Sequence, residues 1–170
     1  MAEIRASGPV VVGVYPGQAV AVVVEAAMLA AEIDRPLLCG YVTLDSYLTE
    51  WEKGDRRQAS LHPVEVDRAE ESVALELAGA ITTALKDRPT LEQGWSLRIL
   101  NGDPSQALTR LAEEVDARLV VVGTHGAGFG RALESWLAGS VATHLSRSVH
   151  RPVVVVPVEH RRGTKSPTLD

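Results

Sequence analysis

The chain has few residues of several kinds, and each shortage excludes a class of protein. It has one cysteine, Cys39, among 170 residues, so no internal disulfide can form. Aromatic residues are scarce, with one Phe, three Tyr and three Trp, so aliphatic side chains must form the core. No apolar run approaches the roughly 18 residues of a membrane span. The formal net charge of −5 excludes the basic surface that is typical of nucleic-acid binding.

The start of the chain lacks the pattern of a secretory signal. Its first apolar run, residues 9–14, is too short for one and is followed closely by Pro16 and Gly17. A single cysteine suits a reducing compartment. We therefore expect a cytoplasmic protein that has neither a membrane nor a nucleic acid as its partner.

Five short runs rich in β-branched residues recur along the chain, each bounded by turn residues. They span residues 10–14, 37–42, 96–100, 119–123 and 152–157. The first, fourth and fifth are almost continuously apolar, which is typical of strands buried on both faces of a parallel sheet. In the third, Leu97 and Ile99 alternate with polar residues, which predicts a strand at a sheet edge.

Helical periodicity fills the gaps between these runs. Apolar residues recur at helical spacing in four segments, and Asp103 followed by Pro104 should begin the third helix. The last helix, from about residue 137 to 149, carries His144 on its inner face, where we interpret it as a packing residue. This alternation predicts an α/β fold of three layers, with helices on both faces of a five-stranded parallel sheet.

We expect the strand order 3-2-1-4-5. The ligand site of such a sheet lies at the carboxyl ends of the first and fourth strands, where the order reverses. Residues 9–158 should form one domain, after a lead of residues 1–8. The polar composition of residues 159–170 predicts a disordered tail, and the long connection over residues 43–61 predicts a mobile or functional loop.

The loop after the fourth strand contains four glycines, at positions 123, 126, 128 and 130. Glycine lets backbone amides approach a ligand closely, as a phosphate cradle requires. Gly139 and Ser140 lie at the start of the last helix, whose amides favour an anion. Turn formation alone would explain the glycines equally well.

Several motifs resemble those of the universal stress protein family. Gly123-Thr-His-Gly, Gly139-Ser-Val and Arg151-Pro-Val-Val-Val-Val-Pro look like its carboxy-terminal signature. Val11-Val-Gly-Val and Gly102-Asp-Pro-Ser-Gln-Ala-Leu resemble its first strand and the entry to its third helix. The resemblance covers about residues 9–158 in the family's order.

The resemblance implies an adenine-nucleotide-binding-like fold of the kind that forms homodimers, accumulates under stress and, in one branch, binds ATP. The homodimer would form through the last strand, which begins at Pro152 and ends at Pro157. The implied nucleotide-binding positions are Gly123, Gly126, Gly139 and Ser140 for phosphate, Thr124 and Val141 beside them, and Val14 and Val42 near ribose and adenine.

Two features depart from the ATP-binding pattern of this family. Twelve residues separate Gly126 from Gly139, where the pattern has nine. Tyr15 follows Val14, where an Asp is usual, and a phenol cannot replace a carboxylate as a ligand of a hard cation. We therefore predict that ATP, with or without magnesium, binds weakly at best.

Other polar residues give no catalytic or metal-binding pattern. The five histidines and the cysteine fall on separate elements, so we expect no catalytic residue and no metal site. Arg131 could contact a phosphate through its planar guanidinium or simply face solvent. Three functions stay open: a stress-associated regulatory domain that binds an adenine nucleotide, an interaction module that binds none, and a weak ATP hydrolase.

Overall fold

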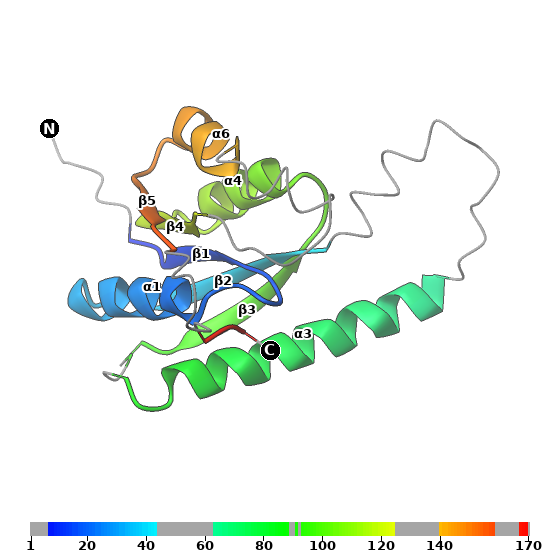
Figure 1. Ribbon diagram of the computed structural model, residues 1–170. Coiled ribbons are helices and arrows are strands. Elements are labelled where there is room, and N and C mark those ends of the chain that lie inside the picture. Colours follow the sequence, from blue (N-terminus) through cyan, green and yellow to red (C-terminus); the bar gives the residue numbers. More distant parts are fainter. Residues whose placement is uncertain are drawn as a thin grey trace, which may run out of the picture.

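The computed structural model describes residues 7–43, 63–88, 91, 93–124, 140–158 and 167–169. Strands and helices alternate along these residues (Figure 1). The strands are β1 (Val10–Val14), β2 (Leu37–Val42), β3 (Trp95–Leu100), β4 (Leu119–Gly123) and β5 (Val153–Val156). The helices are α1 (Val20–Glu32), α3 (Pro63–Leu85), α4 (Pro104–Glu114) and α6 (Ser140–Ser148). Every strand pairing is parallel and the order is β3-β2-β1-β4-β5, which confirms the predicted topology.

The sheet is covered on both faces by helices. In Figure 1, α1 and α3 lie on one face and α4 and α6 on the other. Alternate residues of β1 point to opposite faces, so Val12 joins an apolar cluster with α1 and α3, while Val11 joins one with α4 and α6. Cys39 in β2 is buried in the first cluster, and burial raises the pKa of its thiol to about 12. The predicted three-layer core is thus confirmed.

The two outer strands differ in how much they expose. β3 is the predicted edge strand, and its Arg98 forms an ion pair of 2.8 Å with Glu114 of α4. Leu97 packs into the core as its alternation indicates, but Ile99 is 41 % exposed, so the buried face of β3 does not extend to its end on that side. β5 is the other edge and consists of four valines.

Helix boundaries follow the local signals in the sequence. Asp103 caps α4, since its Oδ1 accepts a hydrogen bond of 3.0 Å from the Gln106 amide, and Pro104 is the first helical residue.

In α6 the buried stripe consists of Val141 and Leu145, four residues apart. His144 lies beside that stripe and is exposed, so its interpretation as a packing residue was wrong.

The chain after β5 returns to the domain. Residues 167–169 lie against the start of α1, and Leu169 is only 2 % exposed, which differs from the disorder expected for this part of the tail.

The predicted loop over residues 43–61 lies outside the described residues, apart from Thr43. Of the helices that the structure describes, none is long and apolar enough to cross a membrane.

Candidate functional site

The strand order reverses between β1 and β4. These strands pair in parallel, with Val10 opposite Leu119 and Val12 opposite Val121, so Val14 and Gly123 end at the same edge of the sheet. Val14 and the neighbouring strand end Val42 are both buried. In open α/β sheets this reversal point is where ligands bind.

Gly123 has a packing role that the sequence did not indicate. A Cβ atom at this position would lie 2.8 Å from Val22 Cγ2, closer than carbon atoms normally approach. The absence of a side chain therefore lets the first turn of α1 pack directly onto the end of β4. Gly123 places the α1 start beside the strand end, whether or not its amide also meets a phosphate.

Thr124 is tied to the chain that leaves β5. Its amide donates to the Val156 carbonyl over 2.9 Å, and its hydroxyl oxygen accepts a hydrogen bond of 2.8 Å from the Val158 amide. Among the described residues, no further partner is seen for the second lone pair and the hydroxyl proton of Thr124. Its side chain thus fixes the start of the glycine-rich loop.

The remaining predicted site residues are described only in part. Ser140 is the first residue of α6, and Val141 is buried in the core cluster of α4 and α6, so its contribution to a site would come from its main chain. Gly126, Arg131 and Gly139 lie outside the described residues. The structure therefore brings Val14, Val42, Gly123 and Thr124 to one edge of the sheet and leaves the rest of the predicted site untested.

Tyr15 occupies the position directly after β1 and is 8 % exposed. Burial removes water from its phenol and raises the pKa of Tyr15 above the usual 10.0. The side chain is therefore neutral near pH 7. It cannot supply the negative charge that a carboxylate would bring to this position.

Gln18 is a polar residue at this edge that sequence reasoning missed. Its side chain is 1 % exposed, and its Nε2 donates to the Gly13 carbonyl over 3.0 Å. Its Oε1 has no hydrogen-bond partner among the residues that the structure describes. Leaving such a group unpaired costs about 1–3 kcal/mol, so an incoming donor would be favoured there. The signal in the sequence is one amide after the Pro16-Gly17 turn, within an otherwise apolar stretch.

A second group of polar residues, also missed, joins the ends of β2 and β3. The Thr43 hydroxyl donates to Asn101 Oδ1 over 3.2 Å, and the Thr43 amide donates to the Leu100 carbonyl over 3.0 Å. Thr43 is 1 % exposed. This contact holds the two strand ends together beside Val42.

The residues that follow the five strands carry no acidic, thiol or imidazole group. They are Tyr15, Thr43, Asn101, Thr124 and Pro157. Within the described ranges, no group of three histidine, cysteine or acidic residues could hold a metal ion. The described part of the edge offers main-chain groups and neutral side chains, which suit binding better than acid–base chemistry.

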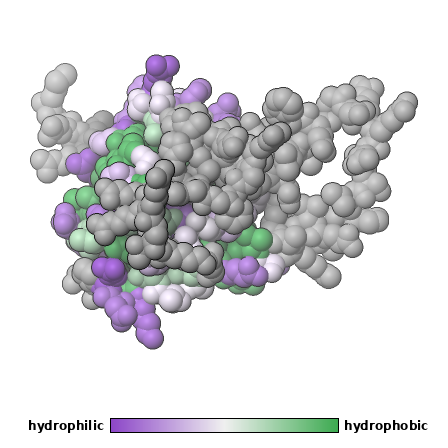
Figure 2. Space-filling view, in the orientation of Figure 1, coloured by the Kyte–Doolittle hydropathy of each residue, from purple (hydrophilic) through white to green (hydrophobic). Residues whose placement is uncertain are grey.

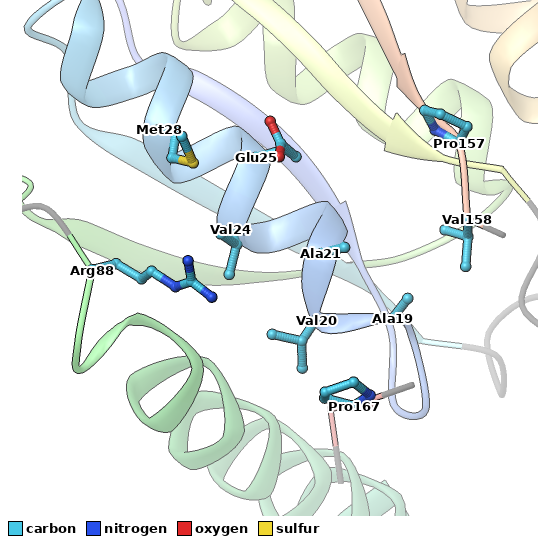
Figure 3. A pocket seen from close by; sticks show the side chains of 10 residues that line it. All are labelled: Ala19, Val20, Ala21, Val24, Glu25, Met28, Arg88, Pro157, Val158 and Pro167. Carbon is cyan, nitrogen blue, oxygen red and sulfur yellow. The ribbon is translucent and has the colours of Figure 1, made fainter. Parts of the chain in front are cut away.

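A cavity of about 640 Å³ lies along the side of α1 and reaches Pro157 and Val158 after β5 (Figure 3). Val20, Val24 and Met28 of α1 line it, and Glu25 and Arg88 are its charged residues. Figure 2 shows hydrophobic surface between hydrophilic residues on the side where α1 and β5 lie. This cavity is mainly apolar and gathers no group of polar side chains comparable to the strand ends.

Comparison with known proteins gives consistent matches. A family model described as the universal stress protein family matches residues 7–157. Universal stress protein MJ0531 of Methanocaldococcus jannaschii is 36 % identical over 77 residues, which cover 43 % of this chain and 44 % of that protein. The match thus spans less than half the length of that relative.

Solved structures resemble nearly the whole chain. A universal stress protein in complex with cAMP is 22 % identical, with a TM-score of 0.56, over 89 % of this chain and 98 % of the other. One from Archaeoglobus fulgidus in complex with dAMP is 17 % identical, with a TM-score of 0.55 and the same coverage. Universal stress protein UspA from Lactobacillus plantarum is 21 % identical, with a TM-score of 0.56, over 91 % and 99 %. At these identities the likeness shows a common fold.

Proposed function

Because the chain belongs to the universal stress protein family, we propose that it is a regulatory domain that binds an adenine nucleotide where β1 and β4 end. The observation that carries this proposal is the reversal point itself, with Gln18 Oε1 buried beside it and unpaired among the described residues. Adenine nucleotides carry hydrogen-bond donors on the exocyclic amine and the ribose hydroxyls, which such an acceptor can meet. Two solved structures of the same fold hold cAMP and dAMP.

The proposed contacts follow the order of the strand ends along the carboxyl edge of the sheet. The main chain at Val14 and Val42 would meet the base and the ribose. The phosphates would meet the main chain at Gly123, Gly126 and Gly139, the residues Thr124, Ser140 and Val141 beside them, and Arg131.

Magnesium should add little to this binding. Tyr15 is neutral, and none of the described strand ends is followed by a carboxylate that could hold the ion. One lost charge-assisted contact typically costs about 1.5–3 kcal/mol, or roughly ten- to a hundredfold in affinity. We therefore propose weak binding, with AMP and cAMP bound as well as ATP.

Calorimetric titration with AMP, cAMP and ATP, with and without magnesium, tests the proposal. We expect dissociation constants of tens of micromolar or weaker, and little change on adding magnesium. Gln18→Leu should weaken AMP binding about tenfold, whereas Gln93→Leu, a change of the same kind at an exposed position, should leave it unchanged. Gly126→Val should abolish it. Absence of binding by the native protein would contradict the proposal, and tight magnesium-dependent ATP binding would contradict its weak, metal-independent form.

We also propose that the protein is a homodimer through β5. Val155 in this edge strand is 43 % exposed, and an open apolar edge strand tends to aggregate unless another chain covers it. A second copy of β5 could cover it in a symmetric contact. Light scattering should show a native dimer that Val155→Lys converts to monomer or insoluble protein. Ile99→Lys, on the opposite edge strand and similarly exposed, should stay dimeric, and a soluble native monomer would contradict the proposal.

The alternative of an interaction module without nucleotide is favoured by one observation, the burial of both Tyr15 and Gln18. A failed titration combined with an intact dimer would support it. ATP hydrolysis has no support from the described strand ends, because none of the five residues that follow the strands carries a carboxylate or imidazole that could act as a base. A role in the stress response and a cytoplasmic location stay predictions.

A further inference from the structure

Residues 167–169 pair with the turn between β1 and α1 through an isolated antiparallel bridge. The Gly17 amide donates to the Leu169 carbonyl over 3.0 Å, and the Leu169 amide donates to the Gln18 carbonyl over 2.9 Å. The Val20 amide donates to the Pro167 carbonyl over 3.1 Å, and Thr168 bridges Ala19. In Figure 1 this red segment lies between the start of α1 and α3.

The pairing supplies what the start of α1 lacks. The first amides of a helix have no partner within it, and Ala19, the residue that caps α1, has no side-chain group to accept from them. The Pro167 carbonyl accepts from the first helical amide, Val20, instead. Without residues 167–169, two amides of this turn would lose their acceptors.

Leu169 anchors the segment through its side chain. It is 2 % exposed and belongs to the apolar cluster formed by β1, α1 and α3, whereas Pro167 and Thr168 are exposed. Backbone pairing along the segment combined with one apolar side chain in a pocket is the way extended peptides bind to a strand edge. The geometry is therefore that of a peptide and its docking site within one chain.

We propose that the turn between β1 and α1 is a docking site for an extended peptide with a leucine anchor, filled here by residues 167–169. We further infer that the docked segment restricts the neighbouring nucleotide site, an inference that rests on the proposed function. Gln18 links the two, because its carbonyl accepts from Leu169 while its side chain lies between the ends of β1 and β4. Releasing the segment removes the hydrogen bonds that hold the main chain at Gly17, Gln18 and Val20, so the turn that carries Gln18 Oε1 is less constrained.

Amide hydrogen exchange tests the docking without any nucleotide. In full-length Leu169→Ser, and in a chain ending at residue 166, the Gly17 and Val20 amides should exchange at least about tenfold faster than in the native protein. Thr168→Ser is the matched control, since it changes the exposed neighbour, and it should exchange at the native rate. Equal exchange in the two serine variants would overturn the docking site.

A peptide supplied separately tests whether the site recognises sequence. A synthetic peptide of residues 164–170, at millimolar concentration, should restore slow exchange at Gly17 and Val20 in the chain ending at residue 166. The same peptide with Leu169→Ser should not. Equal effects of the two peptides would show that no leucine-specific site exists.

Nucleotide titration tests the coupling. Leu169→Ser should bind AMP severalfold more tightly than Thr168→Ser, because its turn is free to open. Equal or weaker AMP binding by Leu169→Ser would overturn the restriction. If none of these proteins binds AMP, the proposed function fails and the restriction with it, while the exchange experiments still decide whether the docking site exists.

Discussion

The two ends of the sheet use polar groups in opposite ways. At the amino-terminal end they are charged, partly exposed and paired: Asp116 binds Arg151, and Arg35 donates to the Ser7 carbonyl over 2.7 Å. At the carboxyl-terminal end the two buried polar side chains, Gln18 and Thr43, are neutral, and Gln18 has a side-chain oxygen with no partner within the described part of the chain. One end therefore stabilises the fold, while the other keeps a hydrogen-bonding group that a ligand can satisfy.

The largest expected effect comes from crowding the amino-terminal end. A Cβ on Gly8 would lie 2.1 Å from the Val115 carbonyl oxygen and 2.3 Å from that of Asp116, and backbone atoms cannot move aside cheaply. Gly8→Ala should therefore push the residues directly before β1 away from Asp116. The free energy of unfolding should fall by about 3 kcal/mol. Urea denaturation measures this, and AMP affinity should stay unchanged.

Gly79→Ala is the matched control for this change. It lies inside α3 and a Cβ there would have no atom within 4 Å, so it should raise the free energy of unfolding by about 0.5–1 kcal/mol. If Gly8→Ala leaves the free energy of unfolding unchanged or raises it, the amino-terminal end is looser than its contacts indicate.

An intermediate effect is expected when the same substitution is made at the carboxyl-terminal end. In Gly123→Ala the new methyl group meets Val22 Cγ2, a buried side chain that can shift slightly, so the loss should be about 1–2 kcal/mol. Adding Val22→Ala makes room for it. The double variant should then lose about 1 kcal/mol less than the sum of the single variants. Strict additivity would show that Gly123 is not held by α1.

The smallest effect should follow from weakening the charged contacts. Asp116→Asn keeps the size of the side chain but removes its charge opposite Arg151, a pair that is partly exposed. The loss should be about 0.5–1 kcal/mol and should shrink in high salt. Glu114→Gln, in the more exposed pair with Arg98, should change the free energy of unfolding less. A larger loss of stability in Glu114→Gln than in Asp116→Asn would mean that the pair of Asp116 and Arg151 does not stabilise this end of the sheet.

The sequence was most informative where a single local pattern decides the outcome. Runs such as Leu119–Gly123 predicted buried parallel strands, and Asp103 with Pro104 predicted the start of α4, because each depends on adjacent residues. The positions of Val14 and Val42 at one edge followed from the strand order.

Other features depend on contacts between distant residues, and sequence reasoning missed them. The polar composition around Leu169 predicted disorder, although its partner turn lies near the other end of the chain. Gln18 gave only a weak signal, a single amide in an apolar stretch, since its burial depends on where β1, β4 and α1 meet. The sequence predicts a buried His144 because its spacing of three residues from Val141 fits the buried face of α6. The same spacing also fits the exposed edge of that face, where the structure has it.

The central place of β1 has a consequence for synthesis on the ribosome. The first strand to be made pairs with β2, but its other edge must wait for β4, since Val10 pairs with Leu119. At typical translation speeds the nascent chain would expose this valine-rich edge for roughly 5–20 seconds. An open strand edge of this kind attracts other chains, so the middle of the sheet is where the newborn protein most needs a chaperone.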